Sequence, residues 1–354
     1  MKILITGNMG YIGPVVMQHL RIAFPEASLI GFDTAYYGTS ITTNTVLPER
    51  CLDAQYYGDI RHFPKGLLKD VDGIIHLAAI SNDPIGNAFE EVTNDINYQS
   101  TVKLATEAKE AGVKSFVFSS SCSIYGAAAD EARDENSPLN PLTAYANSKV
   151  NSERDLEQLA ADDFRITSLR FSTACGMSER LRLDLVLNDF VACAITSKKL
   201  TVLSDGTPWR PLINITDMAR AMEWAISRPV NDGGPFLAVN IGSDNWNYQV
   251  RDLAEAVARI IPGVNVSINQ DAPEDNRSYK VNFNLFKHLA PHHQPQVNLK
   301  LSIEELRDGL TALGFNDPDF RHSRFMRLVH LTNLRKKGYL NSNLEWTWPS
   351  IPTP

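Results

Sequence analysis

Short apolar runs alternate with longer stretches of helical periodicity along most of the chain, and this alternation predicts its elements. The apolar runs end at glycine or polar positions, as buried strands do. They are Lys2–Thr6, Ser28–Phe32, Val71–Ala79, Ser115–Ser119, Arg165–Phe171 and Phe236–Ile241. The main helical stretches are Pro14–Ala23, Thr93–Ala111 and Thr143–Ala161. Strands and helices in alternation are typical of an α/β fold with a doubly wound parallel sheet.

The pattern changes at Ser172, after which loops, helices and short strands are mixed. The expected elements are helices over Leu183–Thr196 and Gln249–Ile261 and strands over Leu200–Leu203 and Val264–Ile268. Between them, a helix that ends at Ile226 is expected to be capped by Thr216 or Asp217. We therefore predict a first lobe and a smaller mixed α/β lobe. The first covers residues 1–172, completed by about 209–242, and the second covers 173–208 and 243–318.

A tail over residues 319–354 follows the second lobe. It contains a predicted amphipathic helix around Phe325–Lys337. We interpret the tail as an element for packing or subunit contact rather than for function. The helices near 93–111 and 143–161 carry more apolar surface than one sheet face requires, which predicts a homodimer. Packing inside one subunit is the alternative.

Composition and charge exclude some classes of partner. The 354-residue chain is 43% hydrophobic and 21% charged, as is usual for a globular protein, and its formal net charge is -7. This charge offers no basic surface to a nucleic acid or an anionic membrane, and no apolar run is long enough to cross a bilayer. The four cysteines lack the paired spacing of a disulfide framework or a metal site. We therefore expect no metal and a reducing compartment. Because a strand and a glycine turn follow Met1 almost at once, we expect no signal peptide, and we interpret the protein as cytoplasmic.

A glycine-rich turn joins the first strand to the first helix. Gly7, Gly10 and Gly13 follow a G-x-x-G-x-x-G spacing. In this context glycines let the backbone approach the pyrophosphate of a dinucleotide, whose charge then lies at a helix N-terminus. Asp33 ends the second strand, where a carboxylate can accept both ribose hydroxyls and repels a 2'-phosphate, which favours NAD over NADP. The alternatives are a glycine turn without a ligand and an aspartate that caps a loop.

Other strand ends supply further expected contacts with the cofactor. Asp59 and Ile60 can present a carboxylate and an apolar wall to adenine, and the small Ala78 and Ala79 leave room for a flat ring. His76 lies within an apolar run, so we interpret it as a satisfied core residue. The full expected cofactor set is Gly7, Met9, Gly10, Tyr11, Ile12, Gly13, Asp33, Asp59, Ile60, Leu77, Ala78, Ala79, Ser119, Tyr145 and Lys149.

A hydroxyl-rich turn and a Y-x-x-x-K pair supply the candidate chemistry. Ser121 lies in the run S-S-S-C-S-I-Y-G, which follows a predicted strand. Tyr145 and Lys149 are four positions apart, so a helix places them on one face. An ammonium beside a phenol favours the phenolate, so Tyr145 can act as a base while Ser121 shares the substrate hydroxyl. For the pair taken alone, a surface tyrosine stacked on a lysine stem is the alternative.

With these motifs in order, residues 1 to about 315 resemble the extended short-chain dehydrogenase/reductase family. Within it, they resemble the NAD-dependent epimerase/dehydratase group that works on nucleotide sugars. The further motifs are H-L-A-A, G-T-P-W-R-P-L-I-N-I and R-S-Y-K-V-N. The resemblance implies a Rossmann-type lobe that holds NAD and a smaller lobe that holds a nucleotide-diphosphate sugar. It also implies that Tyr145 takes the proton of the sugar C4 hydroxyl and that Lys149 holds the nicotinamide ribose.

The expected substrate contacts combine loop positions with family motifs. Ser81 and Asn82 begin a loop at the carboxyl end of a strand, where open parallel sheets keep their ligands. The second half has four loop arginines, Arg180, Arg182, Arg210 and Arg277. Of these, Arg210 and Arg277 lie within family motifs. The full expected substrate set is Ser81, Asn82, Ser121, Thr173, Asn188, Arg210 and Arg277.

Two departures from the family pattern bear on the reaction. Related 4,6-dehydratases carry an adjacent Asp-Glu pair where this chain has Cys122 and Ser123, so the elimination of water lacks its usual acid and base. Thr173 stands where many relatives have an asparagine that touches the substrate phosphate. We therefore expect a nucleotide-sugar epimerase that works through a 4-keto intermediate. The alternatives are a nucleotide-sugar 4-dehydrogenase or reductase, a 4,6-dehydratase, and a catalytically silent NAD-binding sensor.

Cys122 allows two interpretations. As a thiolate it can abstract an acidic proton beside a keto group, as a cysteine one residue later does in a 3,5-epimerase of this superfamily. That role requires a depressed pKa. As a thiol it is a small apolar filler. Both interpretations stay open from the residues alone, and Ser123 is the other residue here with a candidate catalytic role.

Overall fold

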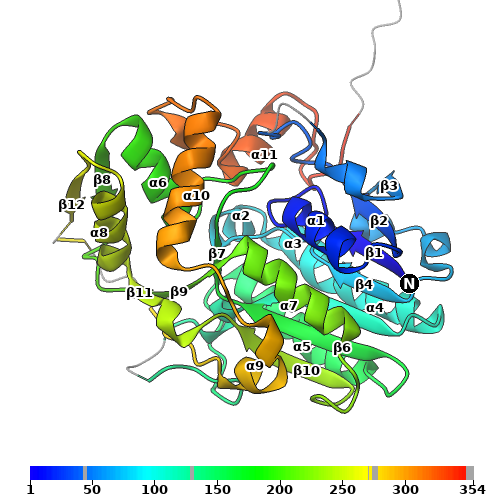
Figure 1. Ribbon diagram of the computed structural model, residues 1–354. Coiled ribbons are helices and arrows are strands. Elements are labelled where there is room, and N and C mark those ends of the chain that lie inside the picture. The colour runs from blue at the N-terminus through cyan, green and yellow to red at the C-terminus, as the bar shows by residue number, and fades with distance from the viewer. Residues whose placement is uncertain (43–45, 128–130, 270, 273–277, 348–354) are drawn as a thin grey trace, which may run out of the picture.

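A seven-stranded parallel sheet forms the centre of the molecule (Figure 1). The computed structural model describes residues 1–42, 46–127, 131–269, 271–272 and 278–347. The strand order is β10-β6-β5-β4-β1-β2-β3, and it reverses between β1 and β4, where open α/β sheets bind their ligands. This confirms the predicted Rossmann-type sheet. The strands are β1 Lys2–Thr6, β2 Ser28–Asp33, β3 Ala54–Tyr57, β4 Gly73–His76, β5 Ser115–Ser121, β6 Arg165–Phe171 and β10 Phe236–Ile241.

Helices cover both faces of this sheet. On one face α1 (Gly13–Ala23) packs against α7 (Ile215–Ser227), and on the other α4 (Ser100–Glu110) packs against α5 (Ala144–Leu159) (Figure 1). The chain enters α4 through α2 (Asp83–Ala88), α3 (Glu90–Asn94) and a π-helical turn over Asp95–Gln99. This turn interrupts the single helix that the spacing predicts over Thr93–Ala111.

The cap of α7 differs from the prediction. Asn214 is the N-cap residue, and its side chain accepts a hydrogen bond from the Thr216 amide at 2.9 Å. Neither Thr216 nor Asp217 caps the helix, so that prediction is wrong. Asp217 is buried and accepts hydrogen bonds from the amides of Gln296 and Val297 at 2.8 and 3.1 Å. Its carboxylate therefore joins α7 to a segment that is distant in sequence.

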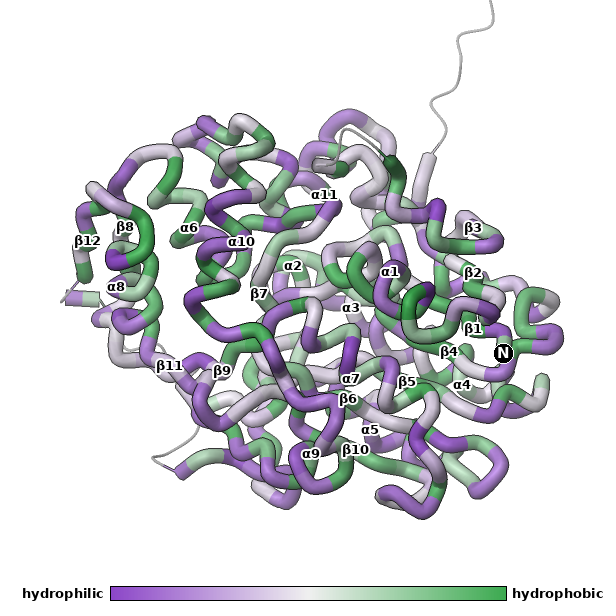
Figure 2. Tube along the Cα trace, in the orientation of Figure 1, coloured by the Kyte–Doolittle hydropathy of each residue, from purple (hydrophilic) through white to green (hydrophobic). Residues whose placement is uncertain are grey.

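The second lobe is built on two small sheets. One holds β7 (Thr173–Cys175), β9 (Trp209–Asn214) and β11 (Asn247–Gln249), and the other pairs β8 (Lys199–Val202) with β12 (Asn265–Ile268). Residues 209–242 were expected to complete the first lobe. Within them β10 pairs with β6 in the central sheet and α7 packs against α1, whereas β9 pairs with β7 and β11. Figure 2 shows apolar and polar residues alternating along the helices of this lobe, as helices with one buried face do. These helices are α6 Val186–Thr196, α8 Val250–Ile260, α9 Asn284–Leu289 and α10 Leu299–Ala312.

The helices that predicted a dimer bury their apolar residues within the chain. Buried positions on them include Ile96, Leu104, Ala105, Ala108 and Leu156. Packing inside one subunit therefore accounts for these residues. The homodimer and the cytoplasmic location stay predictions. Along the part of the chain that the structure describes, no helix is both long and apolar enough to cross a membrane.

His76 is a buried core residue, as predicted. It is 1% exposed, and its ring nitrogens hydrogen-bond the hydroxyls of Thr6 at 2.7 Å and Thr101 at 2.9 Å. Burial, together with the charge of Lys149, lowers the pKa of His76 to about 3. The imidazole therefore stays neutral in the folded chain at every pH at which an exposed histidine would begin to titrate.

Acid is expected to destabilise the fold through His76. The unfolded imidazole gains a proton below about pH 6.5 and the folded one only near 3, so stability falls as the pH falls through this window. Between about pH 7.5 and about pH 5, His76 should cost about 2 kcal/mol of unfolding free energy. Urea unfolding of the parent chain and of His76→Gln at both pH values measures this. Equal losses in the two proteins would contradict a neutral buried His76.

Candidate active site

One pocket of about 330 Å³ brings together most of the predicted residues. It lies at the carboxyl ends of the central strands, and its volume falls within the range of small-molecule sites. Its lining includes Gly7, Gly10, Tyr11, Ile12, Gly13, Asp33, Asp59, Ile60, Leu77, Ala78, Ala79, Ser81, Asn82, Ser119, Ser121, Ser123, Tyr145, Lys149, Thr173 and Arg210. Met9, Cys122 and Asn188 are not part of this lining, and Arg277 lies outside the described residues.

The glycine turn forms a cradle at one end of the pocket. Gly7 has φ +72°, and a Cβ there would lie 2.4 Å from the Ala78 nitrogen, while a Cβ at Gly13 would lie 1.9 Å from the Asn8 oxygen. The packing of the chain therefore requires both glycines. A Cβ at Gly10 meets only the Gly7 oxygen, at 3.2 Å, so this glycine keeps space open in the pocket. The α1 helix has no side-chain cap, which leaves its first amides for an anion.

Asp33 is held in place by two backbone amides. Its carboxylate oxygens accept from the Met9 amide at 2.9 Å and the Ala35 amide at 2.6 Å. Burial raises the pKa of Asp33, and these two hydrogen bonds lower it in part. Met9 was expected to touch the cofactor, but the structure gives its amide this supporting role. An open glycine cradle beside a fixed carboxylate fits the pyrophosphate and the adenosine ribose of NAD.

Ser121, Tyr145 and Lys149 meet in the same pocket. Ser121 ends β5, and the helix that carries the other two begins after Thr143, whose hydroxyl accepts from the Ala146 amide at 3.1 Å. The Ser121 hydroxyl interacts with the Tyr145 phenol and lowers its pKa in part. The Lys149 ammonium donates to the Ser119 oxygen at 2.6 Å and lies 5.6 Å from the centre of the Tyr145 ring.

Burial has the largest effect on the pKa values of Tyr145 and Lys149. It raises the pKa of Tyr145 to about 12, although the hydrogen bond with Ser121 lowers it in part. It also lowers the pKa of Lys149 to about 7, against the charge of Glu153. Lys149 was expected to favour the phenolate of Tyr145, and burial opposes that effect in the structure. The role of Lys149 stays a prediction. The same desolvation that disfavours the phenolate leaves Lys149 charged only part of the time near neutral pH.

Cys122 is buried away from the pocket. It is 0% exposed, and its thiol donates to the Arg170 oxygen at 3.0 Å. Burial raises the pKa of the Cys122 thiol, whereas a catalytic thiolate needs a depressed one. The catalytic interpretation of Cys122 is therefore wrong, and the filler interpretation holds. Ser123 does line the pocket, and its amide donates to the Ser121 hydroxyl at 3.1 Å.

Replacing Cys122 with alanine is expected to leave turnover within about threefold of the parent value, because a buried structural thiol takes no part in the chemistry. Loss of the thiol should lower the unfolding midpoint slightly, since a small cavity forms in the core. Steady-state kinetics and thermal unfolding check the two effects. A large loss of kcat with an unchanged unfolding midpoint would restore a catalytic role for the thiol.

Asn188 serves the interior of the chain. Its side-chain oxygen accepts from the Gly176 amide at 3.2 Å, and its nitrogen donates to the Tyr11 hydroxyl at 3.0 Å and the Arg182 oxygen at 2.9 Å. The Asn188 side chain is fully buried, and these bonds engage its amide. The prediction that Asn188 contacts the substrate is therefore wrong. Thr173 and Arg210, from the second lobe, do face the pocket.

Two residues near the reaction centre were missed from the sequence. Arg182 lines the pocket, pairs with Asp184 at 2.6 Å and donates to the Ser81 hydroxyl at 3.0 Å, so it fixes the loop after β4. Asn97, in the π-helical turn, accepts from the Ile80 amide at 2.7 Å and donates to the Ser148 hydroxyl at 3.2 Å. Arg182 was visible as a loop arginine, whereas a lone asparagine in a helix gave no signal.

Comparisons with known proteins identify the family of the chain. The sequence pattern of the NAD dependent epimerase/dehydratase family matches residues 3–242. The dTDP-D-glucose 4,6-dehydratase of Mus musculus is 26% identical over 271 residues, which are 75% of this chain and 74% of the relative. The UDP-glucose 4-epimerase of Streptomyces lividans is 27% identical over 276 residues, which are 73% of this chain and 80% of the relative.

A solved structure shares the fold. It is the UDP-glucose 4-epimerase from Stenotrophomonas maltophila with bound NAD and formylated UDP-arabinopyranose. The TM-score is 0.76 at 21% identity, with 89% of this chain and 99% of that chain covered. Among the described residues no cluster of His, Cys, Asp and Glu is placed to hold a metal ion. From its sequence pattern and its fold, the chain belongs to the NAD dependent epimerase/dehydratase family, and NAD is its cofactor.

Proposed function

We propose that the protein is a nucleotide-sugar 4-epimerase in which Tyr145 is the base. The observation that carries this proposal is the pairing of an intact Ser121, Tyr145 and Lys149 group with the absence of carboxylates at Cys122 and Ser123. Because the relatives include both an epimerase and a dehydratase, the type of reaction must be argued from the site.

Two of the carboxylates in the described pocket lining are engaged by other groups of the chain. The carboxylates of this described lining are Asp33, Asp59 and Asp83. Asp33 is held in the adenosine half by backbone amides, and Asp59 pairs with Arg61 at 2.5 Å. Asp83 accepts from the Thr143 hydroxyl at 2.7 Å. No adjacent acid and base follow Ser121, so a keto sugar formed here is expected to be reduced again at the same carbon.

Ser121, Tyr145 and Lys149 each have a role in the proposed reaction. Tyr145 takes the proton of the sugar C4 hydroxyl, and Ser121 hydrogen-bonds the same oxygen. Lys149 orients the site through its hydrogen bond to the Ser119 oxygen and adds positive charge whenever it is protonated. NAD, when bound, supplies a hydride acceptor and a positively charged ring. Its charge adds to that of Lys149 and favours the phenolate of Tyr145.

The second lobe is proposed to hold the nucleotide diphosphate. Thr173 on β7 and Arg210 on β9 line the pocket, and Tyr279 joins them. A guanidinium suits diphosphate oxygens, which gives Arg210 this role. Thr173 offers one hydroxyl where an asparagine would offer an amide. Arg277 is proposed for the same diphosphate from its motif alone.

Incubation of the purified protein with a panel of UDP, dTDP, GDP and CDP sugars, without added cofactor, tests the proposal. We expect an isomer of unchanged mass, and NAD released when the protein is denatured. Loss of two mass units with NADH left on the protein would make it a dehydrogenase. Loss of water would make it a dehydratase and overturn the interpretation of Cys122 and Ser123.

A further inference from the structure

A buried arginine of the C-terminal tail lines the cofactor pocket. Arg327 begins α11 (Arg327–Lys336) and lies beyond residues 3–242, which match the family pattern. It is 1% exposed, and its guanidinium lies 3.9 Å from the centre of the Tyr37 ring. Its Nη2 donates to the Arg180 oxygen at 2.8 Å. Its Nη1 is buried and has no hydrogen-bond partner among the described residues.

The charges around Arg327 leave it short of an anion. Arg180 pairs with Glu49 at 2.5 Å and Arg182 pairs with Asp184 at 2.6 Å, but no described carboxylate forms an ion pair with Arg327. Burial lowers the pKa of Arg327 to about 10, so the side chain is still a cation at neutral pH. Asp184 acts on Arg327 from a distance but is paired with Arg182, so the charge of this buried cation is only partly compensated, and a donor left unpaired adds to the cost. An anionic ligand in the pocket would relieve both.

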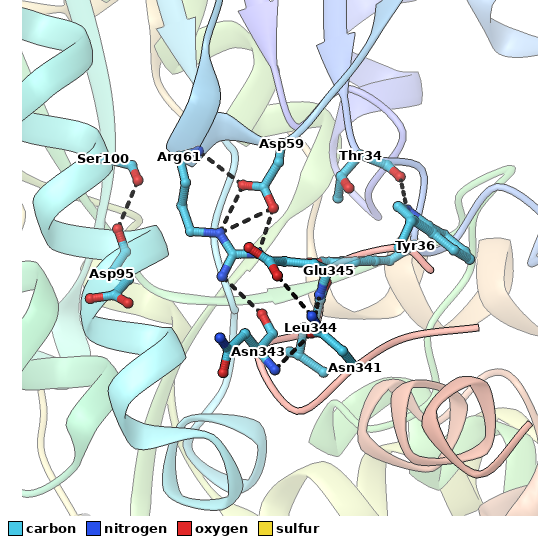
Figure 3. A network of polar contacts seen from close by, with 11 residues as sticks. Thr34, Tyr36, Asp59, Arg61, Asp95, Ser100, Asn341, Asn343, Leu344 and Glu345 are labelled. Carbon is cyan, nitrogen blue, oxygen red and sulfur yellow. Dashed lines mark hydrogen bonds and ion pairs between the residues drawn. The ribbon is translucent and has the colours of Figure 1, made fainter. Parts of the chain in front are cut away.

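Hydrogen bonds hold the tail against the segment that follows Asp33, where the adenosine ribose is expected to bind. The Trp346 ring nitrogen donates to the Thr34 oxygen at 2.6 Å, and a His330 ring nitrogen lies 2.8 Å from the Tyr36 oxygen. Figure 3 shows the tail approaching the segment after β2, where the Tyr36 hydroxyl donates to the Leu344 oxygen. These contacts fix the segment that follows Asp33, and with it Tyr37, on which Arg327 lies.

A second set of tail contacts reaches the strand end that carries Asp59. In Figure 3 the Arg61 guanidinium lies between Asp59 and the tail. It donates to the Asn343 oxygen at 2.8 Å. The tail therefore touches both segments that were predicted to hold adenosine.

We propose that Arg327 is a phosphate ligand of the bound dinucleotide, with Nη1 donating to an oxygen of the NAD pyrophosphate. Guanidinium groups suit such oxygens because the charge assists the hydrogen bond. The diphosphate of the nucleotide sugar has the same chemistry. The dinucleotide is favoured because Arg327 stacks on Tyr37, in the segment after Asp33, and because the tail holds that segment. This role rests on NAD as the cofactor and not on which reaction the protein catalyses.

Calorimetric titration of the full-length chain, freed of bound NAD, with ADP, adenosine and UDP tests the proposal. In Arg327→Met the ADP dissociation constant is expected to rise at least about tenfold, while those of adenosine and UDP stay unchanged. Arg324→Met is the matched control, because Arg324 is an exposed tail residue and the change is chemically the same. It should leave all three constants unchanged.

The other outcomes overturn the proposal. Weaker UDP binding with unchanged ADP binding would assign Arg327 to the sugar nucleotide. If ADP and adenosine lose affinity equally, the substitution has deformed the site rather than removed a phosphate contact. If no dissociation constant changes, Arg327 does not contact a phosphate. If Arg327→Met does not fold, Arg327→Lys replaces it. Lysine keeps the charge but cannot meet both the Arg180 oxygen and a phosphate, so a severalfold weaker ADP affinity is expected.

Discussion

Tyr145→Phe is expected to lower kcat for the nucleotide sugar by about 10²- to 10⁴-fold, the usual contribution of a general base. The amount of NAD bound to the purified protein should not change, because the ring remains and only the hydroxyl is lost. Steady-state kinetics and the absorbance of released NAD measure the two quantities. Tyr98→Phe is a matched control, since the Tyr98 hydroxyl bonds Asp155 outside the pocket lining. Full activity in Tyr145→Phe would remove Tyr145 from the mechanism.

The pH dependence of the parent enzyme should follow from the same hydroxyl. Burial raises the pKa of Tyr145 to about 12 and the hydrogen bond with Ser121 lowers it in part, so kcat/KM should rise with pH as the phenolate forms. Ser121→Ala removes the hydrogen bond and should move this rise to higher pH. An unmoved pH profile in Ser121→Ala would show that Ser121 does not support the phenolate.

Gly10→Val is expected to weaken NAD binding by at least about 100-fold while the chain still folds. A Cβ at Gly10 meets only the Gly7 oxygen, at 3.2 Å, so the added side chain enters the space that the cradle leaves for a pyrophosphate. Calorimetry with NAD and thermal unfolding measure the two effects. Gly66→Val is the control, because a Cβ at Gly66 meets nothing within 4 Å and Gly66 lies outside the pocket lining.

An unfolded Gly10→Val protein would show that Gly10 serves the packing of the chain, as Gly7 and Gly13 do. Retained NAD affinity in a folded variant would place the pyrophosphate elsewhere. The second result would remove Gly10 from the cofactor site, although the family relationship would stand on the rest of the sequence.

Much of the fold was predictable because its signal is local. β1, β6 and β10 begin and end at the predicted residues, since each is an apolar run with polar or glycine boundaries. The π-helical turn at Asp95–Gln99 was not predictable, because one extra residue in a turn leaves a short apolar pattern almost unchanged. Asn214 was missed as a cap because Thr216 and Asp217 offer equally good capping side chains.

The candidate site likewise contains residues that local sequence predicts and residues that it does not. The glycine turn and the Tyr145 and Lys149 pair follow from spacing within one turn and one helix. Cys122 could not be placed from its sequence, because only the 3-10 turn over Cys122–Tyr125 points it to Arg170 rather than to the ligand. Arg327 was out of reach, since it bonds a carbonyl 147 positions away and nothing local relates the tail to the pocket.

The most direct test of a reversible oxidation at C4 is the fate of a deuterium placed on that carbon. The substrate found in the sugar panel would be labelled at C4, incubated without added cofactor and analysed by mass spectrometry and proton NMR. An epimerase with Tyr145 as base is expected to give the isomer with the deuterium still at C4. Deuterium at C6 with loss of water, or deuterium left on the cofactor, would contradict the account.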